Sequence, residues 1–179
     1  MSKVLIISDL HFGHANICKF RPEFTTPSEH DEVILSNILS VLNKRDTLWL
    51  LGDCFFTSGC IYHLREISNA CQNVNWIIGN HDTDKPERQA LVKKAIGEGL
   101  VHKVGSLFKT SKFWLSHAPI HPAELRGKKN IHGHVHRQTI RDDNYLNVCC
   151  ENVNYYPVVL QQLELMPEKV LVEYGNAVS

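Results

Sequence analysis

Five short clusters of polar residues stand out in the first three-quarters of the chain, because each comes at or near the end of an apolar run. The clusters are Asp9-Leu10-His11, Gly52-Asp53, Gly79-Asn80-His81-Asp82, His117 and Gly133-His134-Val135-His136. Carboxylate, amide and imidazole groups together suit manganese, iron, zinc, nickel or cobalt rather than calcium, which prefers oxygen ligands alone. No cysteine lies in these clusters, which disfavours a structural zinc site built on thiolates. The residue types therefore predict a transition-metal centre.

The number of candidate ligands favours two ions over one. A single ion takes three or four protein ligands. Here seven are available: Asp9, His11, Asp53, Asn80, His117, His134 and His136. Two ions that share a carboxylate lie roughly 3.5–4 Å apart and stabilise both the attacking and the leaving oxygen of a phosphate ester. We expect two divalent transition-metal ions, with manganese favoured and iron, nickel, zinc and cobalt fitting the same ligands.

Each cluster taken singly has an ordinary structural explanation. Glycine and aspartate are common turn residues, and Gly133–His136 could be a strand that turns both histidines to one face. The joint occurrence of all five clusters at strand ends favours one shared site, because ligands of open α/β sheets bind at the carboxyl ends of the strands.

The elements that must position these residues are short strands alternating with helices. Strands are expected at Val4–Ser8, Thr47–Leu51, Val74–Ile78, Phe113–Ser116, Val158–Leu163 and Lys169–Tyr174, where apolar runs are rich in β-branched or aromatic residues. Helices are expected near His30–Asn43, over Cys60–Asn73 and from Pro86 to about Ile96. The alternation predicts an α/β layered fold, and the 179 residues predict a single domain over 1–179.

Composition excludes several classes of protein. Lys+Arg and Asp+Glu are both 19, so the net charge is zero, which argues against stable binding of duplex nucleic acid. The six cysteines form no C-x-x-C pair and are expected to be small buried side chains. The N-terminus lacks the pattern of a signal peptide, and no apolar run approaches the ~20 residues of a membrane span. These features predict a cytoplasmic protein that does not use a membrane as partner.

In order and spacing, the five clusters resemble the pattern of the calcineurin-like metallophosphoesterase superfamily: D-x-H, G-D, G-N-H-D/E, H and G-H-x-H. The opening segment Ser8–Asn16 is especially similar to small bacterial and phage members. The resemblance implies a two-sheet β-sandwich core flanked by α-helices. It also implies a phosphoesterase in which a hydroxide held between the two ions attacks phosphorus.

The resemblance also assigns roles residue by residue. Asp9, His11 and His136 would hold the first ion, Asn80, His117 and His134 the second, and Asp53 would bridge the two. His81 would be the general acid that protonates the leaving oxygen, and Asp82 would orient the ring of His81.

Two further residues are candidates for substrate binding. His14 follows the first cluster and could contact the substrate phosphate, although a surface position is an equal alternative. Arg126 lies in the loop Ala118–Asn130 and could bind phosphate through its guanidinium, with a solvated loop as the alternative. His30 and His63 fall in helical segments and are expected at the surface.

The favoured function is a phosphodiesterase for a small phosphorylated substrate, with a cyclic or linear nucleotide as a candidate. A phosphomonoesterase or a nucleotide pyrophosphatase is the enzymatic alternative. A metal-binding interaction scaffold is the non-enzymatic one, and the presence of His81 argues against it. The sequence leaves the oligomeric state open.

Overall fold

The computed structural model describes residues 2–163 and places nine strands in two mixed sheets. The first sheet has the order β4-β3-β2-β1-β9, formed by Lys103–Gly105, Asn73–Ile77, Thr47–Leu50, Val4–Ile7 and Val158–Val159. Strands β1 to β4 run parallel, and β9 is antiparallel to β1. The second sheet has the order β5-β6-β7-β8, formed by Leu107–Lys109, Phe113–Ser116, Lys129–His132 and Tyr145–Asn147.

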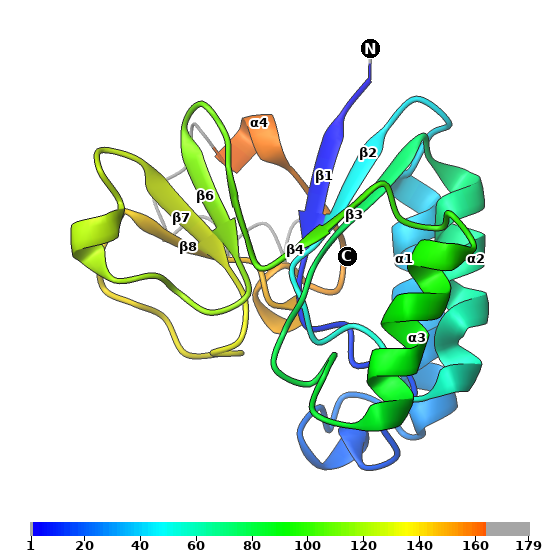
Figure 1. Ribbon diagram of the computed structural model, residues 1–179. Helices are drawn as coiled ribbons and strands as arrows, with labels where there is room; N and C mark the ends of the chain where they lie inside the picture. Colours follow the sequence, from blue (N-terminus) through cyan, green and yellow to red (C-terminus); the bar gives the residue numbers. More distant parts are fainter. Residues whose placement is uncertain (1, 164–179) are drawn as a thin grey trace.

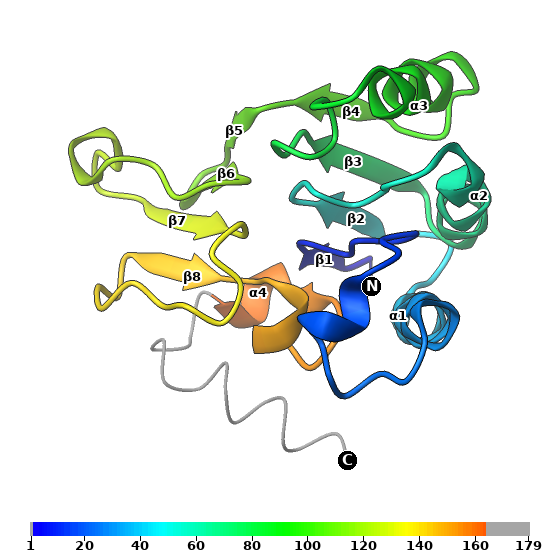
Figure 2. The ribbon, with the colours of Figure 1, turned by 90° about the horizontal axis from the view of Figure 1, so that it is seen from below.

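Three helices cover one face of the first sheet, and the second sheet lies on the opposite side (Figures 1 and 2). They are α1 (Pro27–Val41), α2 (Ile61–Ala70) and α3 (Pro86–Gly97). Helix α1 begins where Thr26 caps it, accepting a hydrogen bond from the Glu29 amide at 3.1 Å. Its buried residues Ile34 and Ile38 are four apart and so share one face of the helix. The layered α/β architecture is therefore the one that the sequence predicts.

The remaining helical segments are short. They are the 3-10 turns η1 (Ile17–Lys19), η2 (Ser58–Cys60), η3 (Pro122–Glu124) and η4 (Cys150–Asn152), and the single helical turn α4 (Leu160–Leu163). The predicted strand over Val158–Leu163 is wrong beyond Val159, because the chain pairs with β1 for two residues and then coils into α4. The predicted strand at Lys169–Tyr174 lies outside the described residues.

The two sheets are joined next to Asp9, the first residue of the five polar clusters. The Ser8 amide donates to the Val148 carbonyl at 3.0 Å, and the Cys150 amide donates to the Ser8 carbonyl at 3.1 Å. The segment that leaves β8 thus pairs with the end of β1. This junction brings the ends of strands from different sheets to one place.

Most buried side chains are apolar, with some informative exceptions. Five of the six free cysteines are buried, as expected, and Cys18 is partly exposed. The expectation that His30 and His63 lie at the surface is wrong, since both are buried. His30 bonds to Arg21 and Asp31, and His63 stacks on Phe12 with the ring planes 4° apart. Within the described part of the chain, no helix is long and apolar enough to cross a membrane.

Candidate dinuclear metal centre

All seven predicted ligands follow strands, and they come from both sheets. Asp9 and His11 follow β1, Asp53 follows β2, Asn80 follows β3, His117 follows β6, and His134 and His136 follow β7. The structure gathers them into two groups, Asp9–His11–His136 and Asp53–His117–His134. Within each group the ligand atoms lie within 4.8 Å of one another. Each group combines residues from both sheets, so the centre lies at the seam between them.

The first group holds polar atoms that have no protein partner. Asp9 Oδ1 and His11 Nε2 are buried, accept or donate no hydrogen bond, and lie 3.7 Å apart. The other carboxylate oxygen of Asp9 is fully used, because Ser8 Oγ, the His134 amide and Cys149 Sγ all donate to it. One oxygen is thus fixed while the other is left facing an imidazole nitrogen. Buried polar atoms are rarely left unpaired, and a cation would satisfy both.

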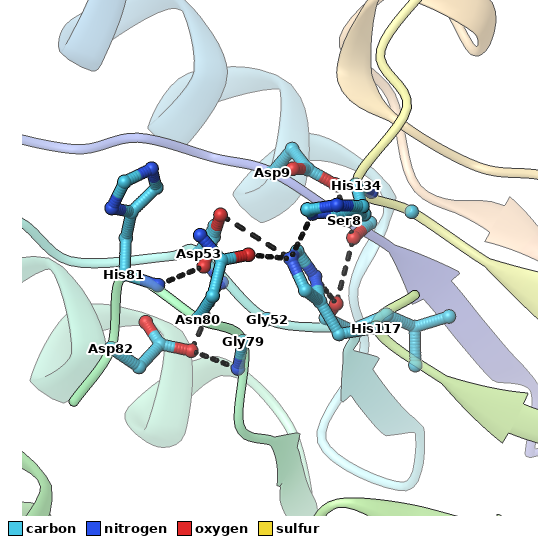
Figure 3. A network of polar contacts seen from close by, with 12 residues as sticks. Ser8, Asp9, Gly52, Asp53, Gly79, Asn80, His81, Asp82, His117 and His134 are labelled. Carbon is cyan, nitrogen blue, oxygen red and sulfur yellow. Dashed lines mark hydrogen bonds and ion pairs between the residues drawn. The ribbon is translucent and has the colours of Figure 1, made fainter. Parts of the chain in front are cut away.

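The second group converges on one nitrogen of His117 (Figure 3). His117 Nδ1 donates to the Leu51 carbonyl at 2.8 Å, so Nε2 faces the centre. There it lies 3.0 Å from Asn80 Oδ1, 3.3 Å from Asp53 Oδ2 and 3.2 Å from His134 Nδ1. Three atoms that carry lone pairs therefore surround a fourth. This donor set fits a divalent transition-metal ion.

The charges at the centre respond to one another. Burial alone would lower the pKa of His117, but the hydrogen bond with Asp53 and the charges of Asp9 and Asp53 outweigh it and raise the pKa to about 9. Burial would raise the pKa of Asp9, but the nearby imidazole of His11 and the charge of His117 hold it well below the usual range. Without an ion, the raised pKa favours a protonated His117, whose positive charge faces the Asp53 carboxylate.

Five of the ligands have backbone conformations that residues with side chains seldom adopt. The φ angle is 59° at Asp9, 55° at His11, 52° at Asp53, 72° at His134 and 51° at His136. Such left-handed residues cost of order 1–3 kcal/mol each and cluster at functional sites. The sharp turns bring successive ligands to the strand ends. At Gly79 and Gly133 the chain passes so close to Asp53 and Asp9 that a Cβ atom would overlap them.

A buried ion pair that the sequence analysis did not identify supports His136. Glu151 Oε1 accepts from Arg21 Nε at 2.9 Å and from His136 Nδ1 at 3.1 Å, which leaves His136 Nε2 free as a ligand atom. Burial would raise the pKa of Glu151, but the hydrogen bond from His136 and the charge of Arg21 lower it. Arg21 is 130 residues from Glu151 and fully buried, so no local motif could have identified this pair.

The prediction that Asp82 orients the ring of His81 is wrong. His81 Nδ1 pairs with Asp84 Oδ2 at 2.9 Å, and Arg88 Nη1 donates to both oxygens of Asp84. Figure 3 shows the ring of His81 directed away from Asp82. The carboxylate of Asp82 instead accepts hydrogen bonds from Trp76 Nε1 and from three backbone amides, those of Asp53, Cys54 and Gly79. Asp82 thus holds the two ligand-bearing turns together.

A cavity of about 670 Å³ borders the first group of ligands, and His11, His14, His81 and His136 are among its lining residues. The structure therefore places His14 beside the centre. Burial and the charge of His11 lower the pKa of His14 to about 4, so its ring is neutral at neutral pH. Arg126 lies elsewhere: its exposed side chain pairs with Glu124, and it lines neither cavity that borders the centre. The predicted contact of Arg126 with substrate is therefore not supported.

The chain is similar to a known protein family and to several known proteins. A family model described as the calcineurin-like phosphoesterase superfamily domain matches residues 2–153. An uncharacterised protein of Methanocaldococcus jannaschii is 28% identical over 94% of this chain and 93% of its own length. The gene 66 protein of Mycobacterium phage L5 is 31% identical over 78% of this chain and 80% of its own. A crystal structure of a protein of unknown function from Aquifex aeolicus matches with a TM-score of 0.70 and 26% identity, covering 92% of this chain and 99% of that one.

Proposed function

Because the chain belongs to the calcineurin-like phosphoesterase superfamily, whose members hydrolyse phosphate esters with metal ions, we propose that it is a phosphodiesterase with a dinuclear centre. The observation that carries the proposal is the pair of ligand groups, Asp9–His11–His136 and Asp53–His117–His134. Asn80, whose Oδ1 lies 3.0 Å from His117 Nε2, is proposed to complete the second group, and Asp53 is proposed to bridge the two ions. Bound there, two ions would lower the pKa of the attacking water and stabilise negative charge on the phosphoryl oxygens.

His81 is proposed as the general acid. Its ring lines the cavity beside the first group, and the pairing of Nδ1 with Asp84 leaves Nε2 to carry the transferable proton. The alkoxide that departs from phosphorus needs a proton, and a donor placed there contributes typically 10²–10⁴-fold to the rate. Asp84, itself held by Arg88, fixes the direction in which the ring points.

Space on both sides of the centre supports a diester over a monoester. The first cavity borders His11 and His136, and a second one of about 450 Å³ borders Asn80, His117 and His134. A phosphodiester carries two substituents on phosphorus, whereas a monoester carries one. A centre with a cavity on each side suits the molecule with two substituents.

The test uses purified protein stripped with a chelator and then supplied with Mn, Ni, Zn or Mg. Hydrolysis of bis-p-nitrophenyl phosphate is compared with that of p-nitrophenyl phosphate. We expect metal-restored cleavage of the diester that is lost in His81→Ala and kept in His102→Ala, an exposed histidine next to β4. Faster cleavage of the monoester would show that the protein is a phosphomonoesterase instead. Cleavage of neither, with two ions bound, would favour a metal-binding scaffold.

A further inference from the structure

The cavity beside His81 is chemically unlike the second cavity. Besides the histidines, it is lined by the cations Lys85, Arg88 and Arg137 and by the apolar side chains Ile17, Phe20 and Val135. The second cavity has no Lys, Arg, Asp or Glu among its lining residues. We call the first one the His81 cavity. Since the proton donor opens onto it, the part of the substrate that leaves with the proton must lie there.

An aromatic ring is exposed at the rim of the His81 cavity. Phe20 is 67% exposed, far more than the other phenylalanine of this cavity. That residue, Phe56, is buried, with His11 stacked at 4.8 Å and the Arg88 guanidinium 4.0 Å from the ring centroid. Phe20 makes one tilted contact, with His14 at 5.9 Å. An open aromatic face beside cations suits a planar heterocycle, because every nucleobase can stack on such a ring.

Most charges in the His81 cavity are already paired, and one cation is not. Arg88 is bound to Asp84, Arg137 to Glu23, and Glu151 to Arg21. Lys85 is exposed and makes no ion pair with any residue from 2 to 163. It is the N-cap of α3, so its backbone position is fixed while its side chain reaches the cavity. An anionic group on the ligand would find its partner there.

Together, the open face of Phe20 and the side chain of Lys85, unpaired within residues 2–163, decide what the His81 cavity can bind. It offers contacts to a planar ring and to an anion.

We propose that the His81 cavity receives a nucleoside phosphate as the leaving group, with Phe20 stacking on the base and Lys85 pairing with its phosphate. This inference rests on the proposed function, because His81 is what identifies the leaving side. In the reaction, the oxygen of water bonds to phosphorus and its proton is lost to solvent, while the ester P–O bond breaks. The leaving oxygen of the nucleoside phosphate takes the proton from His81, which solvent then reprotonates. The substrate is then a phosphodiester whose leaving side carries a second phosphate, such as a dinucleotide with a terminal phosphate on that side.

The test measures binding of three probes to the Mn-loaded protein by calorimetry. Adenosine 5′-monophosphate carries ring and anion, adenosine carries the ring alone, and ribose 5-phosphate carries the anion alone. We expect Phe20→Ala to weaken the binding of adenosine 5′-monophosphate and of adenosine about tenfold. The affinity for ribose 5-phosphate should stay the same. Lys85→Ala should weaken the binding of the two probes that carry a phosphate several-fold and leave the affinity for adenosine unchanged. Lys93→Ala, an exposed lysine of the same helix outside the cavity, is the matched control.

Hydrolysis of bis-p-nitrophenyl phosphate separates this inference from the proposed function. Nucleotide binding no tighter than that of inorganic phosphate, or unchanged in both variants, would overturn the inference alone if the diester is cleaved. Nucleotide binding that depends on Phe20 and Lys85, in a protein that cleaves no ester with any metal, would overturn the phosphodiesterase and the leaving-group assignment together.

Discussion

Variants of His81 and of its partner Asp84 test catalysis separately from metal binding. We predict that His81→Ala keeps both ions and loses 10²–10³-fold in kcat, because His81 lies outside the ligand groups. Asp84→Asn should keep both ions and lose about tenfold, since the ring is then less firmly oriented. Metal content and kcat, measured on the same samples, check this. An equal loss of bound metal in His81→Ala would contradict the role given to it.

Asp82 serves as the comparison for that experiment. Its carboxylate accepts hydrogen bonds from the Trp76 indole and from the amides around Asp53. Asp82→Asn replaces one acceptor oxygen by a donor and leaves buried N–H groups unpaired. We expect it to lower the melting temperature, unlike Asp84→Asn. Normal stability with a selective loss of kcat would return the orienting role to Asp82.

A variant of Glu151 tests whether the hydrogen bond from His136 to this carboxylate strengthens metal binding. We predict that Glu151→Gln weakens binding of the first ion by 10–100-fold, as is typical for the partners of metal-ligating histidines. The variant removes the charge that faces the buried Arg21 and that fixes the tautomer of His136. Titration with Mn²⁺, followed by calorimetry, measures the affinity. An unchanged affinity accompanied only by lower stability would show that Glu151 supports the fold and not the ligand.

The elements that carry the ligands depend on close backbone approach. At Gly133 an added Cβ would overlap Ser8 Oγ and Asp9 Oδ2, whereas at Gly97 it would meet nothing within 4 Å. We predict that Gly133→Ala lowers the free energy of unfolding by about 1–3 kcal/mol and weakens metal binding. Gly97→Ala, at the end of α3, should be neutral or slightly stabilising. Urea denaturation of both variants checks this, and equal effects would refute it.

How far the sequence predicts the strands depends on whether each one carries a largely apolar run. Strands β1, β2, β3 and β6 are almost wholly buried and were predictable from their apolar runs. Strands β4 and β5 have only three residues each and no fully buried position, so they give no such signal. Strands β7 and β8 are nearly all buried but were not predicted either, because polar residues interrupt their apolar runs. The candidate ligands of the two groups lie together because the segments that leave β1, β2, β6 and β7 meet at the seam between the sheets. The partners Arg21 and Asp84 were missed because folding topology or turn geometry, not a motif, selects them.

Seen as a whole, the molecule has its candidate metal centre at the seam between its two sheets. Asp9 and His11 from the first sheet meet His136 from the second, and Asp53 meets His117 and His134. Ions bound there should stabilise the fold by mass action, about 2.7 kcal/mol for one site at a hundredfold excess over Kd. We predict that chelation lowers the melting temperature and that Mn²⁺ restores it. No difference between the two forms would argue against ions at the seam.

The same arrangement predicts how stability depends on pH. Without ions, the pKa of His117 is about 9 in the folded protein, above its ordinary value of 6.5. A raised folded-state pKa contributes stability below pH 6.5 that is lost as pH rises through 9. The melting temperature of the metal-free protein should therefore fall from pH 6.5 to 9. The melting temperature of the metal-loaded protein should fall less over this range, because the ion replaces the proton. The same fall in both forms would contradict this.

The left-handed turns at the ligands also limit how the centre could be re-engineered. Apart from glycine, asparagine, aspartate and histidine adopt positive φ most readily, and the five strained ligand positions hold only aspartate and histidine. Exchanging His134 for cysteine or Asp9 for glutamate, to favour another ion, would place a residue ill suited to that conformation at the most crowded part of the chain. The backbone conformation thus limits which residue types can serve at these five positions, whichever metal ion is to be bound.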